Sequence, residues 1–218
     1  MRTRSTPLAL VVVALAVIVA ACAPTSATTD SSSAVNPGVC VNDPKPVVAV
    51  IEFENTTGGS GGLNVTGLET AATARLITLL TNSGCYVIVE RSELQTILAA
   101  QGLESMAPDV LARAAGAGYV VTGAVTRATI DRPGVTALGI TVGNVRAEVA
   151  VDVRATDLIT GRVVVSQTGV GDAQRANLSI SQLPIGTISF TNPTWEPLLA
   201  DASDAALAEV VRSIRSRF

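Results

Sequence analysis

Apolar residues in the first half of the chain follow strand-like and helix-like patterns in turn. Residues 47–53 are nearly all apolar and rich in valine and isoleucine, which is typical of a strand buried on both faces. Residues 65–82 carry apolar side chains at helical spacing, and Ser83-Gly84 ends that pattern. The side chains expected on the buried stripe of this helix are Leu68, Ala72, Leu76 and Leu79.

The alternation of strands and helices continues to about residue 130. A second strand is expected at 85–90 and a third at 119–130. Between them we expect a helix that Ser92 caps and that ends near Gln101, followed by a short helix over residues 108–116. Strands that alternate with helices in this way predict an α/β sheet.

The second half of the chain changes to a pattern of antiparallel strands. Apolar residues from Val145 to Val153 alternate with charged residues, which predicts a half-buried strand. Upstream the phase of this alternation reverses beside Gly143. The reversal indicates either a β-bulge or a strand that passes from one apolar environment to another. Thr160-Gly161 then predicts a turn into a further strand at 163–171.

Two inserts and a last helix complete the expected domain. The inserts lie near residues 128–144 and 172–193, and the second holds two short alternating pieces, 178–180 and 188–190. An amphipathic helix is expected at 196–215. Its apolar face would carry Leu199, Ala202, Ala206, Val210 and Ile214.

The first residues have the pattern of an export signal. Arg2 and Arg4 precede an apolar run, residues 8–23, which is shorter than the 20 or so residues that a membrane span needs. The run ends in Ala20-Ala21-Cys22, which resembles a bacterial lipobox. We therefore expect a signal peptide at 1–21 and a covalent lipid on Cys22. The alternative is an ordinary secretory signal with an incidental cysteine.

The next segment is expected to be a tether, so that the chain divides into 1–21, a lipidated tether at 22–46 and one domain at 47–218. Residues 23–38 are rich in Ser, Thr, Ala and Pro and carry a single charge, which is typical of a flexible linker. Cys40 and Cys85 each precede a predicted strand. In an oxidising compartment they would pair as a disulfide; otherwise they are two buried thiols.

Composition narrows the class of function. The chain has no histidine, so catalysis and metal binding that depend on imidazole are excluded. A formal charge of −3 and a pI near 5.0 argue against a nucleic-acid partner. Only six of the 218 residues are aromatic: Phe53, Tyr86, Tyr119, Phe190, Trp195 and Phe218. The core is therefore expected to consist of aliphatic side chains, and we expect no enzyme, metal or cofactor other than the lipid.

Candidate chemistry within the predicted domain is sparse. The glycine-rich stretch at 58–62 lies between a strand and a helix but lacks the Gly-Lys-Ser/Thr ending of a phosphate loop. We interpret it as a flexible loop. Glu52, Glu54 and Glu90 lie near strand ends, where solvated carboxylates or ion pairs are the simplest interpretation.

Several motifs in order resemble the curli production assembly/transport (CsgG-like) family of outer-membrane lipoproteins. They follow a lipobox and extend from Val47 to Arg215. The motifs are the strand at 47–53 with Glu54-Asn55, the run 83–91 with Leu94, Leu98 and Gln101, the segment Ala114–Val125, and Val151–Arg154 continuing through Asp157 to Thr160-Gly161-Arg162.

The resemblance implies an anticodon-binding-like α/β (α+β) domain, with a mixed sheet flanked by helices and two inserted β-hairpins. In channel-forming members, protomers form a ring whose hairpins line a transmembrane pore for secreted subunits. The pore-facing loop would be residues 56–64 here, with Thr56, Gly58 and Asn64 as candidates. That loop contains no aromatic residue, so Asn64 alone would supply the amide found at the constriction.

Two functions follow from the resemblance. The first is an envelope-anchored protomer that forms a ring with further copies of itself and exports or assembles surface or extracellular proteins. The second is a periplasmic lipoprotein that binds and regulates an envelope-assembly partner without a pore. The lipid would attach either form to an outer membrane facing the periplasm, or to the outer face of the plasma membrane where only one membrane exists.

Overall fold

The computed structural model describes residue 40 and residues 42–60, 62–102, 106–131, 134–137, 140–175 and 184–217. These residues belong to one unit, 32–218, and the expected signal peptide and Cys22 lie outside the described residues. The chain forms, in order, β1 (Val47–Val50), β2 (Glu54–Asn55), η1 (Thr57–Ser60), β3 (Asn64–Thr66), α1 (Leu68–Ser83), β4 (Val87–Val89), α2 (Arg91–Ala100), α3 (Pro108–Ala114), β5 (Tyr119–Asp131), β6 (Gly134–Ala137), β7 (Ile140–Gly143), β8 (Val145–Asp157), β9 (Val163–Arg175), β10 (Thr187–Ser189) and α4 (Glu196–Arg215).

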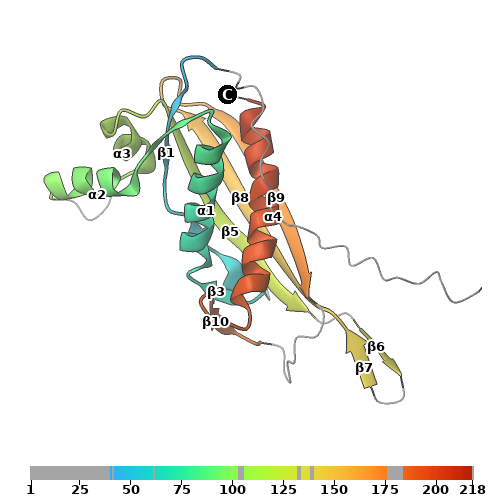
Figure 1. Ribbon diagram of the computed structural model, residues 1–218. Coiled ribbons are helices and arrows are strands. Elements are labelled where there is room, and N and C mark those ends of the chain that lie inside the picture. The colour runs from blue at the N-terminus through green and yellow to red at the C-terminus, as the bar shows by residue number, and fades with distance from the viewer. Residues whose placement is uncertain are drawn as a thin grey trace, which may run out of the picture. The chain divides into compact units, whose positions relative to one another are not determined.

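The main sheet has the strand order β4-β1-β5-β8-β9, and β2 pairs with β5 beyond the end of β1 (Figure 1). β1 lies parallel to β4 and to β5, as the strand and helix alternation predicted. β5, β8 and β9 are long antiparallel neighbours. The sheet is therefore mixed, and the α/β (α+β) fold class expected from the sequence is confirmed.

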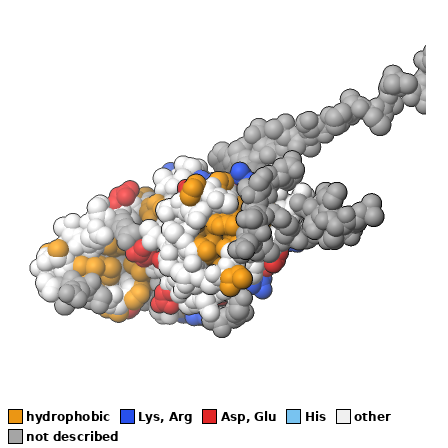
Figure 2. Space-filling model, turned by 90° about the horizontal axis from the view of Figure 1, so that it is seen from below, with side chains coloured by type: hydrophobic (Ala, Val, Ile, Leu, Met, Phe, Trp, Pro, Cys, Tyr) orange, Lys and Arg blue, Asp and Glu red, His pale blue; other side chains and the backbone are white. Residues whose placement is uncertain are grey.

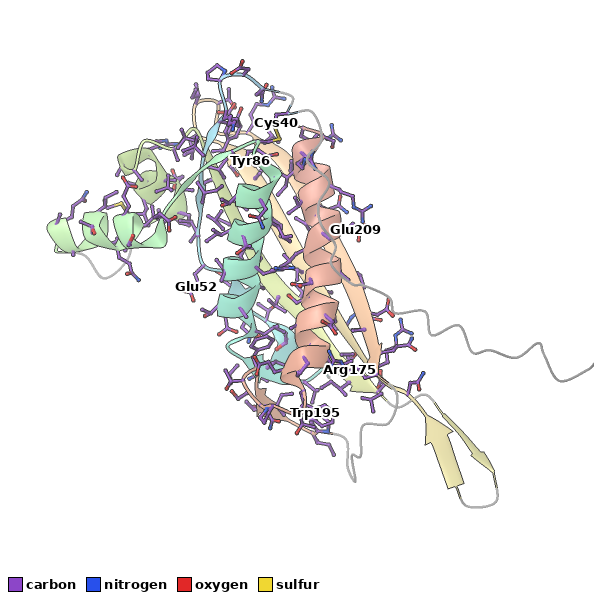
Figure 3. The ribbon with its side chains drawn as sticks, in the orientation of Figure 1. Cys40, Glu52, Tyr86, Arg175, Trp195 and Glu209 are labelled. Atoms are coloured by element: carbon purple, nitrogen blue, oxygen red, sulfur yellow. A yellow bond between two sulfur atoms is a disulfide. The ribbon has the colours of Figure 1, made fainter. Side chains whose placement is uncertain are left out.

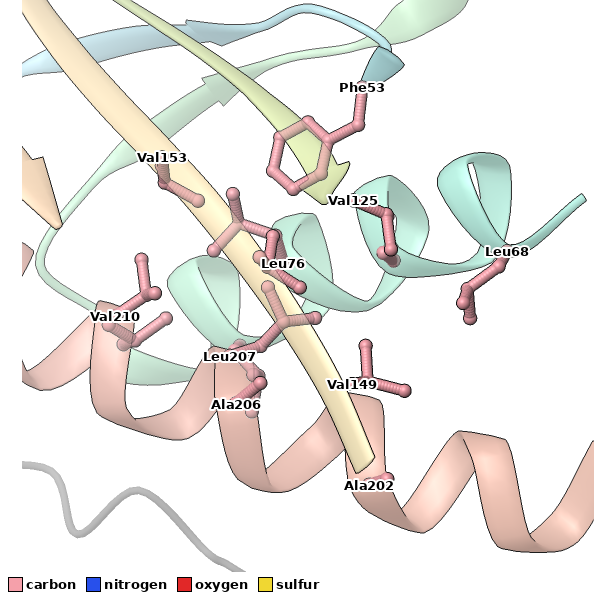
Figure 4. Packing of buried hydrophobic residues seen from close by; sticks show 14 of the residues in the cluster. Phe53, Leu68, Leu76, Val125, Val149, Val153, Ala202, Ala206, Leu207 and Val210 are labelled. Carbon is pink, nitrogen blue, oxygen red and sulfur yellow. The ribbon is translucent and has the colours of Figure 1, made fainter. Parts of the chain in front are cut away.

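Helices α1 and α4 pack side by side on one face of this sheet, and the larger apolar core lies beneath them (Figure 1). Leu76 of α1 and Leu207 of α4 are fully buried against Val125 of β5 and Val149 of β8 (Figure 4). The predicted apolar stripes of both helices are buried throughout. Removing this aliphatic surface from water is the main term that stabilises the domain.

A smaller apolar core lies on the opposite face, under α2 and α3. It contains Ala49, Val89 and Val120 from the strands, and Leu94 and Leu111 from the two helices. Along β8 and β9 this opposite face is different. Apart from Ala150, the side chains of β8 and β9 that alternate with the buried ones are half-buried or exposed.

Several element boundaries differ from the predictions for local physical reasons. α1 begins at Leu68, because residues 64–66 form β3. The predicted cap at Ser92 is wrong, since α2 already includes Ser92 and its N-cap residue is Glu90, with no side-chain hydrogen bond to the helix. Gly84 ends α1 in the left-handed conformation that glycine favours, as predicted.

The phase reversal at Gly143 marks the passage from one sheet to another. β7 ends at Gly143 and pairs only with β6 among the described residues, whereas β8 begins at Val145 in the main sheet. The first insert is therefore shorter than predicted. Residues 128–131 still belong to β5, so the described strands of the separate hairpin are Gly134–Ala137 and Ile140–Gly143.

The second insert is also shorter than predicted, because β9 continues to Arg175. Its second alternating piece forms β10, which pairs in parallel with β3. The first piece, 178–180, lies outside the described residues. No helix among the described residues combines the length and the hydrophobicity needed to cross a membrane.

Candidate functional site

Cys40 and Cys85 form a disulfide at the end of the sheet where β1 and β4 begin. Their Cα atoms are 5.2 Å apart, and Val87 N–H donates to the Pro46 carbonyl at 3.0 Å beside them. Figure 3 shows Cys40 and Tyr86 at this end of the sheet. The two alternatives for these cysteines were a disulfide and two buried thiols, and the structure has the disulfide. The disulfide joins the end of the expected tether to the start of β4.

The expected pore-facing loop, residues 56–64, lies beyond the end of β1 and is attached to β5. Thr56 N–H donates to the Val125 carbonyl at 3.0 Å, and Leu63 N–H donates to the Ala128 carbonyl at 2.9 Å. Thr57 is completely buried in η1. The glycine-rich stretch at 58–62 thus begins within η1, and main-chain hydrogen bonds join the residues on both sides of the stretch to a long strand.

Asn55 organises this loop. Its Nδ2 donates to the Val65 carbonyl at 2.7 Å and to Glu69 Oε2 at 2.8 Å. Its Oδ1 accepts from the N–H and from the hydroxyl of Thr57, at 3.1 and 2.7 Å. Every hydrogen-bonding group of the amide is thus used. One side chain holds β2, η1, β3 and the first turn of α1 together.

The three candidates for the pore-facing loop have different positions. Thr56 and Gly58 are exposed, and Asn64 is half-buried in β3. Gly58 and Asn64 lie together, since a Cβ on Gly58 would be 3.6 Å from Asn64 Cβ. Thr56 lies on β5 instead, and its hydroxyl donates to the Val125 carbonyl at 3.2 Å.

The β6–β7 hairpin lies between β5 and β8 in the chain and forms a separate two-stranded sheet. Gly134 pairs with Gly143, and Ala137 pairs with Ile140. Each strand has four residues, which corresponds to a length of about 13 Å at 3.3 Å per residue. A hydrocarbon core about 30 Å thick needs strands of about 9–11 residues. The described hairpin alone is too short to cross it.

The open face of β5, β8 and β9 carries most of the charged groups that the sheet presents. Arg127 and Glu148 form an ion pair at 2.6 Å, and Arg146 lies 3.6 Å from Asp172. Asp152 accepts a short hydrogen bond from Thr168. Charges pair across neighbouring strands, as expected for a surface in contact with water. The alternation of charged residues along β8 was visible in the sequence, but their partners were not.

The carboxylates near the strand ends are dispersed. Glu52 accepts a hydrogen bond from the Thr70 hydroxyl at 2.7 Å. Glu54 lies on the open face and lines a shallow hollow of about 330 Å³ with Asp152 and Arg154. No group of three or more possible metal ligands occurs among the described residues.

Seen from the end where β3 and β10 lie, hydrophobic side chains form separate patches (Figure 2).

Three titratable groups among the described residues have shifted pKa values: Tyr86, Asp157 and Asp204. Burial raises the pKa of Asp204 in α4, against the opposing effect of the Arg75 charge. Burial raises the pKa of Tyr86 to about 12, against an opposing effect of the Arg215 charge. The backbone N–H groups of Thr160 and Ile159 bind the Asp157 carboxylate and lower its pKa. None of these three groups belongs to a cluster of possible metal ligands among the described residues.

Comparisons with known proteins give one family match. The family model described as "Curli production assembly/transport component CsgG" matches residues 40–217 of this chain. No curated protein matches the chain.

Solved structures resemble the chain at low identity. The hypothetical protein CT253 from Chlamydia trachomatis is 15% identical, with 79% of this chain and 97% of that chain covered and a TM-score of 0.48. The LpoB C-terminal domain from Salmonella enterica is 23% identical, with 57% of this chain and 81% of that chain covered and a TM-score of 0.41. The PelC dodecamer from Paraburkholderia phytofirmans is 19% identical, with 80% of this chain and 90% of that chain covered and a TM-score of 0.41. Scores of this size carry no argument about function.

Proposed function

Because this chain belongs to the family of the curli production assembly/transport component CsgG, we propose that it is an envelope lipoprotein whose domain forms a ring with further copies of itself. In that ring it would take part in the export or assembly of surface or extracellular proteins. The observation that carries the proposal is the family match, which includes all of the described residues.

The disulfide supports an extracytoplasmic location. Disulfides form and persist in oxidising compartments such as the periplasm and are rare in the cytosol. The bond between Cys40 and Cys85 agrees with the export signal that the first residues resemble. A lipid on Cys22 would then attach the domain to a membrane surface through the segment that precedes Cys40.

Labelling of the full chain with radioactive palmitate tests the membrane anchor. Wild type should incorporate the label, and Cys22→Ala should not. Ala23→Ser is the matched control, because it changes the neighbouring residue and retains the thiol. Labelling of Cys22→Ala at the wild-type level would contradict the proposal.

Mass measurement of the detergent-extracted full chain tests the self-assembly. A single species with several times the mass of one chain is expected. A monomer at every protein concentration that can be measured would contradict the ring.

A second candidate function is favoured by the short β6–β7 hairpin. Four-residue strands do not cross a bilayer, so the same fold would then bind an envelope-assembly partner without forming a pore. Conductance in planar bilayers separates the two candidates. The export pore predicts stable ion-conducting steps from the extracted oligomer, whereas the second candidate predicts none.

A further inference from the structure

An apolar slot lies beyond the carboxyl end of β1. β1 ends at Val50, and three residues, 51–53, separate it from β2, which pairs with β5 further along. The slot has a volume of about 180 Å³ and lies between α1 on one side and α2 with α3 on the other. Its aliphatic lining consists of Val50, Ile51, Ile77, Leu94, Leu98 and Leu111.

The position of the slot is one at which α/β sheets bind ligands. β1 lies between β4 and β5 in the sheet. The chain passes from β1 through α1 to β4, and then from β4 through α2 and α3 to β5 on the other side of β1. Crevices outside the carboxyl ends of strands, where successive connections pass to opposite sides, are the usual binding sites of such sheets. Pockets for small molecules have volumes of about 300–1,000 Å³. This slot is smaller and suits one aliphatic side chain.

The chain presents an exposed aliphatic side chain that matches the slot. Ile159, in the turn between β8 and β9, is 90% exposed. Asp157 Oδ1 accepts from the N–H groups of Ile159 and Thr160 at 2.8 and 3.1 Å, and Gly161 N–H donates to the Asp157 carbonyl at 2.8 Å. The turn is held by its own hydrogen bonds. Insertion of Ile159 into an apolar site would therefore order little additional chain.

The charges around the turn and the slot are complementary. Arg162 is exposed in the same turn as Ile159. Glu52 and Gln95, which are both exposed, line the slot. Figure 3 shows Glu52 beside α1. An aliphatic side chain accompanied by a guanidinium group therefore suits this slot, because the Glu52 carboxylate attracts the cation.

We propose that Ile159 of one copy of the chain inserts into the slot of a second copy, with Arg162 facing Glu52. The inserted turn and the slot are different surfaces of the molecule, so the contact is head-to-tail. Contacts of this kind close into rings when the rotation between copies permits. The inference rests on the proposed self-assembly and identifies the surfaces that produce it.

Disulfide cross-linking of the full chain in detergent tests the contact directly. The double variant Ile159→Cys/Gln95→Cys should form a ladder of dimers and higher species on a non-reducing gel. The double variant Ile185→Cys/Gln95→Cys is the control, because Ile185 is 93% exposed and lies in a different part of the fold. Absence of a ladder from the first pair, or equal ladders from both, would overturn the contact.

A substitution series separates this inference from the proposed function. Ile159→Glu should raise the concentration at which half of the protein is assembled by more than tenfold, and Ile159→Val should leave it within about threefold. Circular dichroism should show both variants folded, since Ile159 touches no core. If wild type assembles and Ile159→Glu assembles equally well, only the slot contact fails. If wild type itself is monomeric, the proposed ring fails.

Discussion

Gly171 of β9 lies directly against Ala202 of α4. A Cβ placed on Gly171 would overlap the carbonyl oxygen of Ala202 and the Cβ of Ala205, and a Cβ on Gly169 would overlap the Ala206 carbonyl. Ala202 and Ala206 are both completely buried. Two glycines facing two alanines thus let the backbone of the helix approach the backbone of the strand.

Gly171→Ala should therefore destabilise the domain strongly, because α4 would have to move away from β9. Overpacking of a close contact costs about 3 kcal/mol. In a protein of this size that loss lowers the midpoint of thermal unfolding by about 6–12 °C. Gly118→Ala is the control, since its Cβ would meet only the Val47 carbonyl at 3.9 Å. Equal midpoints for the two variants would contradict this packing.

Asn55→Ala should loosen the segment between β2 and α1. It removes four hydrogen bonds and leaves the buried Thr57 without its side-chain partner. We expect a loss of about 2–3 kcal/mol in the free energy of unfolding, measured by urea titration. Asn82→Ala, an exposed position in α1, should change it by less than about 0.5 kcal/mol. A neutral Asn55→Ala would mean that the segment is held by its backbone bonds to β5 alone.

The double variant Cys40→Ala/Cys85→Ala should be less stable than wild type. The disulfide closes a loop with a sequence separation of 45 residues, and restricting such a loop in the unfolded chain is worth about 4 kcal/mol. Denaturant unfolding of wild type in strong reductant should agree with unfolding of the double variant. If the variant unfolds at the wild-type denaturant concentration, the bond does not stabilise the fold.

Alkaline titration should distinguish Tyr86 from an exposed tyrosine. Its pKa is raised from 10.0 to about 12 in the folded protein because its hydroxyl is buried. The stabilisation that follows from this shift is complete below pH 10 and disappears as the pH rises from about 10 to about 12. Ultraviolet titration of tyrosinate should show a late phase that Tyr86→Phe removes. A late phase that persists in Tyr86→Phe would contradict the burial of this hydroxyl.

The elements with strong periodicity were predicted well, and those held by distant partners were not. α4 was predicted at its observed bounds, because a long series of apolar residues at helical spacing indicates a helix and nothing else. The apolar residues of that series all face one sheet. β3 was missed, because it has only three residues and its partner is β10, far along the chain. A strand of that kind leaves no periodic signal.

The sequence was least informative about which polar side chains bind one another and which residues surround a common space. Asn55 was recognised only as part of a motif, because the groups that it binds come from η1, β3 and α1, which the periodicity does not bring together. The slot beside Leu94 was missed for the same reason, since its lining comes from four elements and the stretch after β1. Tertiary structure alone places such residues around one space.

Electron microscopy of the detergent-extracted, full-length protein tests the proposed ring. We expect class averages of closed rings with rotational symmetry, in which identical domains repeat around a central opening. Particles that contain a single domain, from protein whose Cys22 lipid has been verified by labelling, would contradict it.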